Sequence, residues 1–463
     1  MSEMPIPKVS PKPVVRSVFE TNVPQGALSV IARIKPDQVE AVRGLLWLVD
    51  DGDVEDNDIV PFVKITSVHF ARFVILEESR DLQGRTLQPC LAFSTNYDKP
   101  LEKHLRELVD VAGPGLERIF SRCEGYPAAT PGTEAKDRAL AFLRANQVPY
   151  MAFYIGTRGR SVGQIRYESE LRNAIQGFLD KASRKPGFLL GAPLEIRRAI
   201  QAFVKEQFPE AERYYQSEKR PTLSAFLARY GQLAAVLGGV AAVVVMAFVY
   251  PLPVLLLVGG AALLLAAVLR YREMRDPQDG MQLNATNVKD LAERENQIVQ
   301  NQLTHLVDIK PGAFRLMALK GVLWSINVLA KAIFNKGKLG EIPTIHFARW
   351  IIIDEGRRLL FFSNFDGSWE NYLGDFVDKA AVGLTGVWSN TVGFPKTRWL
   401  VLDGATDEQR FKIWTRNHQI TTQVWYSAYK TLTVQNINNN SDICRLLFTP
   451  MTEQEAIAWL QKL

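Results

Sequence analysis

The segment from Gly231 to Leu269 contains no charged residue, and no other stretch constrains the fold of this chain as strongly. It reads GQLAAVLGGVAAVVVMAFVYPLPVLLLVGGAALLLAAVL. One membrane crossing needs about 20 apolar residues, and this run is nearly twice as long. The sequence YPLP interrupts it near the middle, where proline ends a helix and disfavours helix in the preceding residue. We therefore predict a transmembrane helical hairpin over residues 231–269, with burial in a large soluble core as the alternative.

Two features of this segment predict its packing and its orientation. The pairs Gly238-Gly239 and Gly259-Gly260 would let the two helices approach closely. Basic residues flank both ends of the run: Lys219, Arg220, Arg229, Arg270, Arg272 and Arg275. The positive-inside rule places such flanks in the cytoplasm. We expect an integral protein of the inner or plasma membrane, with the lipid bilayer as a partner and both termini in the cytoplasm.

The regions on either side of the hairpin repeat each other. HFAR occurs at His69–Arg72 and again at His346–Arg349, and RGLLW and KGVLW precede these motifs at the same offset. Further blocks match in the same order: FSTNYD with FFSNFD, IFSRCEGYP with VWSNTVGFP, and RANQVPYMAFY with RNHQITTQVWY. The chain is therefore an internal duplication with the membrane hairpin inserted between the copies.

This reading divides the chain of 463 residues into successive segments. The N-terminal arm is rich in proline and charge, which is typical of disorder. The expected segments are a disordered arm at 1–25, a first repeat at 26–206, a linker at 207–230, the hairpin at 231–269, a linker at 270–298 and a second repeat at 299–463.

Each copy predicts the order β-α-β-β-α-β and hence the α+β class. In the first copy, ALSVIARI, ITSVHFARFVIL, PCLAFSTNY and YMAFYIG have the alternating or continuous apolar pattern of strands. KPDQVEAVRGLLWLV and PLEKHLRELVDVAGPGLERIF have helical spacing. We expect each copy to form a four-stranded sheet with helices on one face. The other face is also apolar, so we expect it to be buried against the other copy.

This order is that of the ferredoxin-like split unit. Two such units in one chain resemble the dimeric α/β-barrel superfamily, in which two ferredoxin-like units pair their sheets into one barrel. The resemblance implies an intrachain barrel. Members include dye-decolourising peroxidases, chlorite dismutases, monooxygenases and small-molecule binders, so it also implies a ligand within the barrel. NFDGS at Asn364 resembles the GxxDG motif of dye-decolourising peroxidases, but Ser363 replaces the first glycine and the role of the motif's aspartate does not transfer to Asp366.

The repeated polar residues are the candidate site. Alternate residues of a strand share a face, so the histidine and the arginine of each HFAR should point to opposite sides. One interpretation is structural, with repeated histidine-to-backbone bonds and ion pairs from each arginine to an aspartate. The other makes a histidine the ligand of haem iron and an arginine the stabiliser of bound peroxide. The candidates are His69, Arg72, Asp98, His346, Arg349 and Asp366 for catalysis, His69 and His346 as metal ligands, and Asn96, Asn364 and Trp350 for ligand binding.

The net charge, the cysteines and one further histidine bear on which classes of partner and ligand are expected. A net charge of +6 is too small for a nucleic-acid partner. The 3 cysteines lack zinc-ligand spacing and suit a reducing compartment. His104, in the charged stretch EKHLREL, is expected to be solvated.

The hypothesis with the widest support is a membrane-anchored, cytoplasm-facing barrel that binds an apolar small molecule or haem and has a peroxidase-like oxidoreductase activity. The alternative is a non-catalytic membrane scaffold or interaction module.

Overall fold

The computed structural model describes residues 23–51, 53–129, 131–182, 191–212, 223–278, 280, 282–333 and 342–463. Most of the expected N-terminal arm and residues 213–222 of the first linker lie outside this set. The chain forms two compact units. The larger contains Pro24–Arg158 and Arg220–Asn438, and the smaller contains Gly159–Lys219 and Asn439–Leu463.

Two antiparallel four-stranded sheets form the centre of the larger unit. The first has the order β1 (Gln25–Arg33), β5 (Cys90–Asp98), β2 (Val68–Leu76) and β12 (Val424–Ser427). The second has the order β6 (Ala152–Ile155), β8 (Ile345–Ile353), β9 (Arg358–Asp366) and β7 (Gln300–Asp308). Each sheet therefore takes three strands from one copy and its fourth strand from the other.

This exchange corrects the expectation that each copy completes its own sheet. The segment before β6 first runs along β1, where the Ile31 N–H donates to the Asn146 carbonyl (3.1 Å). It then crosses to β8 of the other copy. The segment before β12 does the converse, because the Ile420 N–H donates to the Thr304 carbonyl of β7 (3.0 Å) before the chain reaches β2. Each crossing segment is thus hydrogen-bonded to both sheets.

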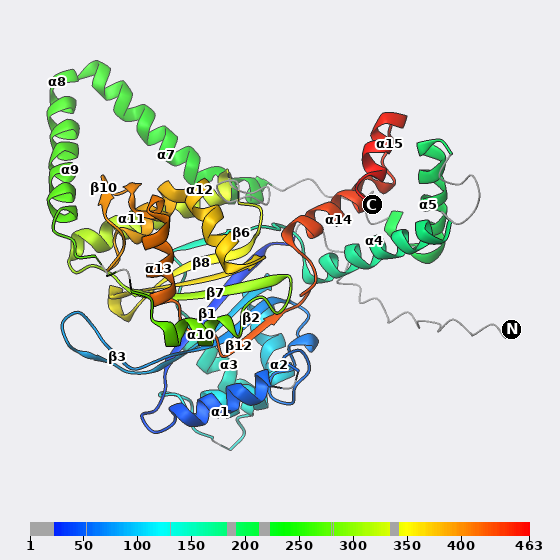
Figure 1. The fold of residues 1–463 in the computed structure, drawn as a ribbon, viewed down its shortest axis with the longest axis horizontal. Coiled ribbons are helices and arrows are strands. Elements are labelled where there is room, and N and C mark those ends of the chain that lie inside the picture. Colours follow the sequence, from blue (N-terminus) through cyan, green and yellow to red (C-terminus); the bar gives the residue numbers. More distant parts are fainter. Residues whose placement is uncertain are drawn as a thin grey trace. The chain divides into compact units, whose positions relative to one another are not determined.

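The two sheets pack face to face through apolar side chains and carry helices on their outer faces (Figure 1). The inner contact is made by Val74, Leu76, Ala92, Ile351, Leu360 and Phe362. The first sheet is covered by α1 (Val39–Asp50), α2 (Leu101–Phe120) and α3 (Ala135–Ala145), and the second by α11 (Ala313–Ala332), α12 (Trp369–Trp388) and α13 (Glu408–His418). The α+β class is confirmed, and neither sheet closes into a barrel among the residues described.

The smaller unit is helical and joins the C-terminal parts of both copies. It contains α4 (Val162–Ala182), α5 (Pro193–Gln207), the end of α14 (Val434–Leu447) and α15 (Glu453–Leu460). Its core includes Leu171, Ile200, Val204, Ile443 and Trp459. Arg197 of α5 donates to the carbonyls of Leu446 (2.9 Å), Leu447 (2.7 Å) and Thr449 (2.5 Å), which ties the first copy to the end of α14.

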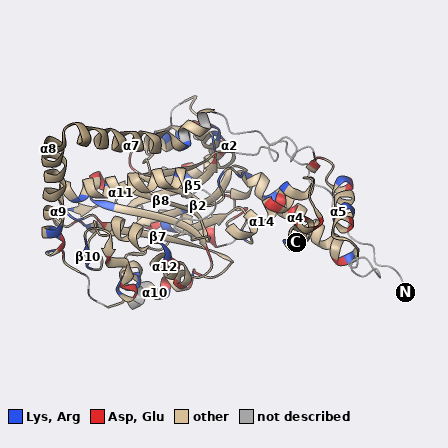
Figure 2. Ribbon diagram, turned by 90° about the horizontal axis from the view of Figure 1, so that it is seen from above, with Lys and Arg blue, Asp and Glu red and all other residues tan. Residues whose placement is uncertain are grey.

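The uncharged segment forms two consecutive apolar helical stretches that separate at Tyr250. The first is α7 (Leu223–Val249); the second comprises α8 (Pro251–Val254), a π-helical turn at Leu255–Gly259 and α9 (Gly260–Glu273). Figure 2 shows no charged residue along most of their length. Among the described residues, three helical stretches are long and apolar enough to span a membrane: 229–249, 251–273 and 313–332, the last being α11.

The glycine pairs do not bring these helices together. A methyl group added at Gly238, Gly239 or Gly260 would meet no described atom within 4 Å, and one at Gly259 would meet only Leu255 of its own stretch. The expected close contact through these pairs is therefore wrong for this structure.

The strand exchange predicts that neither half folds alone. Residues 1–220 lack β12, which covers the edge of β2, and their β6 lacks β8. We expect this half to aggregate when it is expressed alone, because unpaired strand edges are exposed. Co-expression with residues 276–463 should restore solubility and give a one-to-one complex by size-exclusion chromatography. Two differently tagged copies of 1–220 are the control, and two separately soluble, folded halves would contradict the exchange.

Candidate functional site

The two HFAR motifs lie against each other at the centre of the larger unit. Their strands β2 and β8 belong to facing sheets. The His69 ring lies 5.3 Å from that of Phe347, and the Phe70 ring lies 5.2 Å from that of His346. Phe70 and Phe347 themselves are 5.8 Å apart. The duplication therefore brings its two most similar segments into one reciprocal contact.

Each HFAR histidine occupies a β-bulge. Val68 pairs with Tyr97 and Phe70 with Asn96, so His69 is an extra residue in β2. The same irregularity lies at His346 in β8. A bulge changes the direction of a side chain, which breaks the strict alternation assumed from the sequence. The expectation that histidine and arginine point to opposite sides is therefore wrong: His69 contacts Phe347, and Arg72 also reaches the other copy.

Both histidines are fully buried and bind aspartates. His69 Nε2 lies 3.0 Å from Asp98 Oδ1, and its Nδ1 lies 2.9 Å from the Tyr429 hydroxyl. His346 Nε2 lies 2.7 Å from Asp366 Oδ1. Among the described residues these aspartates thus partner the histidines, so the expected arginine–aspartate pairs and histidine-to-backbone bonds are wrong.

Arg72 crosses from β2 into the sheet of the second copy. Its guanidinium donates to two backbone carbonyls and three side-chain oxygens there: Leu303 O (3.0 Å), Ser363 O (2.8 Å), Gln302 Oε1 (3.2 Å), Thr304 Oγ1 (3.0 Å) and Asn364 Oδ1 (2.5 Å). Only 2% of Arg72 is exposed. Carbonyls, hydroxyls and amides thus satisfy this buried cation in place of a carboxylate.

Arg349 makes the reciprocal crossing into the first copy. It donates to the Leu28 carbonyl (2.6 Å), to Ser29 Oγ (3.1 Å) and to the Ser94 hydroxyl. Burial lowers the pKa of Arg349 to about 9. Burial also lowers the pKa of Arg72 well below its usual value, and the charge of Arg349 adds to that effect. The Phe362 ring lies 5.0 Å from one guanidinium and 5.5 Å from the other.

The structure brings the candidate asparagines together and leaves the tryptophan apart. Asn364 Nδ2 donates to Asn96 Oδ1 (3.2 Å), and Trp425 Nε1 donates to Asn364 Oδ1 (2.9 Å). Trp350 lies instead in the core between the second sheet and its helices, 4.8 Å from the Phe361 ring. The site is therefore a polar cluster between the sheets that excludes Trp350.

This cluster does not fit haem ligated by either histidine. Both ring nitrogens of His69 are already hydrogen-bonded. Nδ1 of His346 has no partner among the described residues, but its ring is enclosed by Phe70 at 5.2 Å and Tyr429 at 6.0 Å. A haem needs a cavity of several hundred Å³. Neither histidine lines the two larger cavities described next.

Two cavities lie elsewhere in the larger unit. The larger, of about 660 Å³, lies beside α1 and combines apolar side chains such as Ile75 and Leu306 with charged ones such as Arg43 and Glu293. Trp47, which lines it, is 55% exposed.

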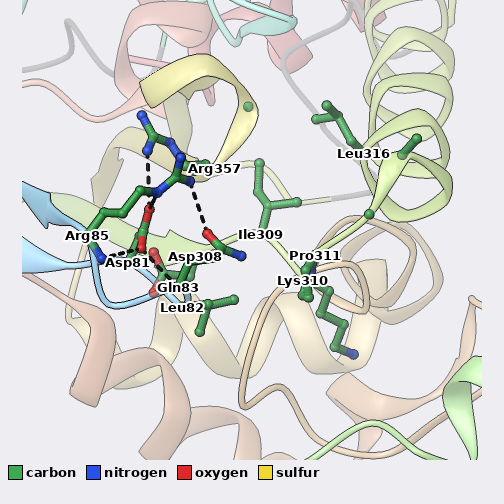
Figure 3. Close-up of a pocket in the computed structure, with 13 residues that line it drawn as sticks. Asp81, Leu82, Gln83, Arg85, Asp308, Ile309, Lys310, Pro311, Leu316 and Arg357 are labelled. Carbon is green, nitrogen blue, oxygen red and sulfur yellow. Dashed lines mark hydrogen bonds and ion pairs between the residues drawn. The ribbon is translucent and has the colours of Figure 1, made fainter.

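The smaller cavity, of about 280 Å³, is drawn in Figure 3. Its arginines converge on one carboxylate, because Arg85 Nε and Arg357 Nη1 lie 2.8 Å and 3.1 Å from Asp81 Oδ2. Its lysine, Lys310, binds Asp276 at 2.7 Å. The cations of this cavity are therefore already paired.

Sequence reasoning missed Tyr429 and misplaced His104. Tyr429 follows β12 and has no matching motif that would have identified it. His104 is fully buried, not solvated: its ring nitrogens lie 2.9 Å from Ser67 Oγ and 2.8 Å from Thr95 Oγ1. Its spacing from the buried Leu108 of α2 is the signal that would have placed it on the inner face.

Comparisons with protein-family models, with curated proteins and with solved structures found no match to this chain.

The burial of His104 predicts a pH dependence. Burial lowers its pKa to about 3, so the folded protein stays unprotonated there while the unfolded chain binds a proton below about pH 6.5. The free energy of unfolding therefore keeps the contribution of His104 above the pKa that this histidine has in the unfolded chain. It loses that contribution as the pH falls towards 3. We expect the free energy of unfolding in detergent to fall by about 2 kcal/mol from this residue between about pH 7 and pH 5. His104→Gln should remove that part of the loss, and an unchanged pH profile in the variant would contradict the assignment.

The five bonds of Arg72 predict that lysine cannot replace it. A lysine carries one compact ammonium and cannot reach acceptors on two strands at once. We expect Arg72→Lys to lower the free energy of unfolding by at least about 2 kcal/mol in denaturant titrations. Arg43→Lys, at an exposed ion pair, is the matched control and should change it by less than about 0.5 kcal/mol. Equal effects of the two substitutions would show that the hydrogen bonds of Arg72 to the opposite copy do not stabilise the protein.

Proposed function

We propose that this protein is a membrane-anchored interaction module with a structural, non-catalytic centre. The observation that carries the proposal is that His69 and Arg72 already use their hydrogen-bonding groups within the protein. His69 uses both ring nitrogens, and Arg72 makes five bonds to the opposite copy. A general base or an oxyanion stabiliser must have a donor or acceptor available to the substrate. These groups instead hold two sheets together.

We further propose that the two sheets and the crossing segments act as one barrel-like body related to the dimeric α/β-barrel superfamily. The support is the reciprocal bonding of the crossing segments. The Val148 N–H donates to the Ser29 carbonyl of the first sheet (2.9 Å), and the Met151 N–H donates to the Trp350 carbonyl of the second (2.8 Å). A single short segment is thereby hydrogen-bonded to both sheets.

The proposed anchor is the pair of apolar helical stretches α7 and α8–α9. Arg229 lies near the start of the first stretch, and Arg270 and Arg272 lie at the end of the second. By the positive-inside rule these ends face the cytoplasm of an inner or plasma membrane, and so do both repeats and both termini.

A second candidate function is binding of a small molecule in the 660 Å³ cavity. Its volume lies in the range of known ligand sites, and it combines apolar surface with a few charged groups. This ligand would bind beside α1 and away from the HFAR cluster, which is consistent with a structural role for the cluster.

Haem reconstitution tests the non-catalytic proposal. The full-length protein, purified in detergent and incubated with hemin, should show no Soret band above that of a buffer control. His346→Ala and His69→Ala should behave identically in this assay. A Soret band that one of these substitutions abolishes would overturn the proposal in favour of a haem protein.

Reporter fusions test the anchor. We expect cytoplasmic signals from fusions at Met1 and at Leu463, because two crossings return the chain to its starting side. Val244→Arg places a charge in the first stretch and should disfavour insertion by roughly 2.5–3.5 kcal/mol, which is measurable as loss of the protein from carbonate-washed membranes. Leu82→Arg, on an exposed loop of the larger unit, is the control and should leave the membrane fraction unchanged. An external signal from either terminus would refute the topology.

A further inference from the structure

Helix α11 connects the two ends of the apolar hairpin. At its C-terminal end, Lys331 Nζ lies 3.5 Å from Gln232 Oε1 near the start of the apolar run in α7. At its N-terminal end, the Arg272 guanidinium of α9 lies 5.6 Å from the Phe314 ring. Arg315 also binds Asp276, which follows α9. A helix of 20 residues is about 30 Å long, so α11 runs from the base of one apolar helix to the base of the other.

The fold shows that α11 does not cross the bilayer, although its length and composition suit a crossing. Strand β7 precedes α11 in the chain and β8 follows it, and β9 lies between them in one sheet. A crossing by α11 would place two strands of one sheet on opposite sides of the membrane. The helix also packs Leu319, Leu323 and Arg315 into the protein, where each is at most 1% exposed.

The other face of α11 is apolar and exposed. Met317 is 70% exposed and Trp324 is 45% exposed, and the exposed Lys320 lies on the same side by helical spacing. A Cβ atom added to Gly386 of α12 would lie 3.4 Å from a methyl group of Val322 in α11 and 3.5 Å from a methyl group of Val401. Val322 and Val401 therefore meet beside Gly386, so the turn that contains Val401 lies close to α11.

That turn joins β10 (Thr397–Arg398) to β11 (Leu402–Asp403) and is fastened to the end of the hairpin. The Glu273 side chain, at the last residue of α9, is fully buried. It accepts hydrogen bonds from the backbone N–H groups of Trp399 (3.0 Å) and Leu400 (2.6 Å) and from Thr397 Oγ1 (3.3 Å).

The turn has an uncommon backbone that exposes apolar side chains. Trp399 and Leu400 have φ values of 55° and 69°, which large L-residues rarely adopt, and Glu273 satisfies the N–H groups of both. Trp399 is 47% exposed and Leu402 is 42% exposed. Tyr271, on the neighbouring turn of α9, is 52% exposed. Tryptophan and tyrosine at the end of an apolar helix are typical of the membrane–water interface.

We propose that α11 and the β10–β11 turn form a membrane-contact face that lies in the headgroup region of the cytoplasmic leaflet. This inference rests on the proposed anchoring by the hairpin. The lipid surface is favoured as the occupant because the face is continuous with both ends of the hairpin. Two basic residues of this region, Arg272 and Lys320, also complement anionic headgroups, whereas Arg270 and Arg398 bind Glu273 and Asp403. Glu273 is a positioning residue that holds Trp399 and Leu402 at the level of the helix end.

The duplication supplies a matched test. Trp324 and Trp47 occupy equivalent positions of the two repeats and are exposed to similar extents, 45% and 55%, but only Trp324 lies on this face. We would spin-label Trp324→Cys and Trp47→Cys in the full-length protein, reconstituted in vesicles of phosphatidylcholine and phosphatidylglycerol. The accessibility of each label to oxygen, which enriches in lipid, is compared with its accessibility to a water-soluble nickel chelate. The native cysteines are buried.

We expect the ratio of oxygen to nickel accessibility to be several-fold higher at position 324 than at position 47. Equal ratios in a protein that resists carbonate extraction would overturn the membrane-contact face and leave the anchor intact. Loss of the protein from the membrane fraction would instead overturn the anchor. Low accessibility to both reagents, with spin–spin broadening at position 324, would identify a second copy as the occupant and also overturn the inference.

A second label tests the role of Glu273. On the Leu402→Cys background, Glu273→Ala should lower the oxygen-to-nickel ratio at position 402 several-fold, while the ratio at position 324 stays unchanged. Glu273→Gln keeps a carbonyl acceptor for the turn and should restore most of the ratio. Unchanged ratios at position 402 in the alanine variant would show that Glu273 does not position the turn.

Discussion

The exchange of the fourth strands is the constraint on which the rest of this structure depends. Strand β12 of the second copy completes the first sheet, and β6 of the first copy completes the second. Each copy therefore has an unpaired edge until the other is present. Two buried arginines make each copy depend further on the other. Arg72 and Arg349 each donate their hydrogen bonds to acceptors of the opposite copy. The duplicated residues thus serve the joining of the copies.

The hydrogen bonds of Arg72 and Arg349 also explain why arginine occupies these positions. A buried cation is costly unless several acceptors replace its water. The guanidinium of Arg72 presents its donors in a planar fork, and it reaches acceptors on β7 and β9 at once. A carboxylate partner would have neutralised the charge, but Asp98 and Asp366 bind the bulged histidines. The repeated residues thus have two roles. Each histidine–aspartate pair lies at a bulge, and each arginine joins the two sheets.

Local patterns in the sequence predicted helices and strands, but they did not predict which distant segments contact each other. The apolar periods identified β1, β2, β5 and β6 and the helices α1 and α2 of the first copy, but not α3, α4 or α5, and the repeat identified the residues that meet at the centre. The partner of β6 could not be predicted, because alternation defines the faces of a strand and not its neighbour. The bulges at His69 and His346 break that alternation, so the expected direction of both histidines was wrong. His104 was misjudged because its charged neighbours concealed its position above Leu108 on the inner face of α2.

The same exchange restricts how the chain can meet a membrane. Strand β2 precedes the two apolar helical stretches and β12 follows them, yet these strands are hydrogen-bonded neighbours. A sheet cannot pair across a bilayer, because its unpaired backbone groups would have to enter hydrocarbon. The number of crossings between Leu76 and Val424 must therefore be even. Of the three stretches with suitable length and composition, α11 lies between strands of one sheet and is excluded by the same rule. The two stretches at 229–249 and 251–273 remain, so if either one spans the membrane, the other must span it as well.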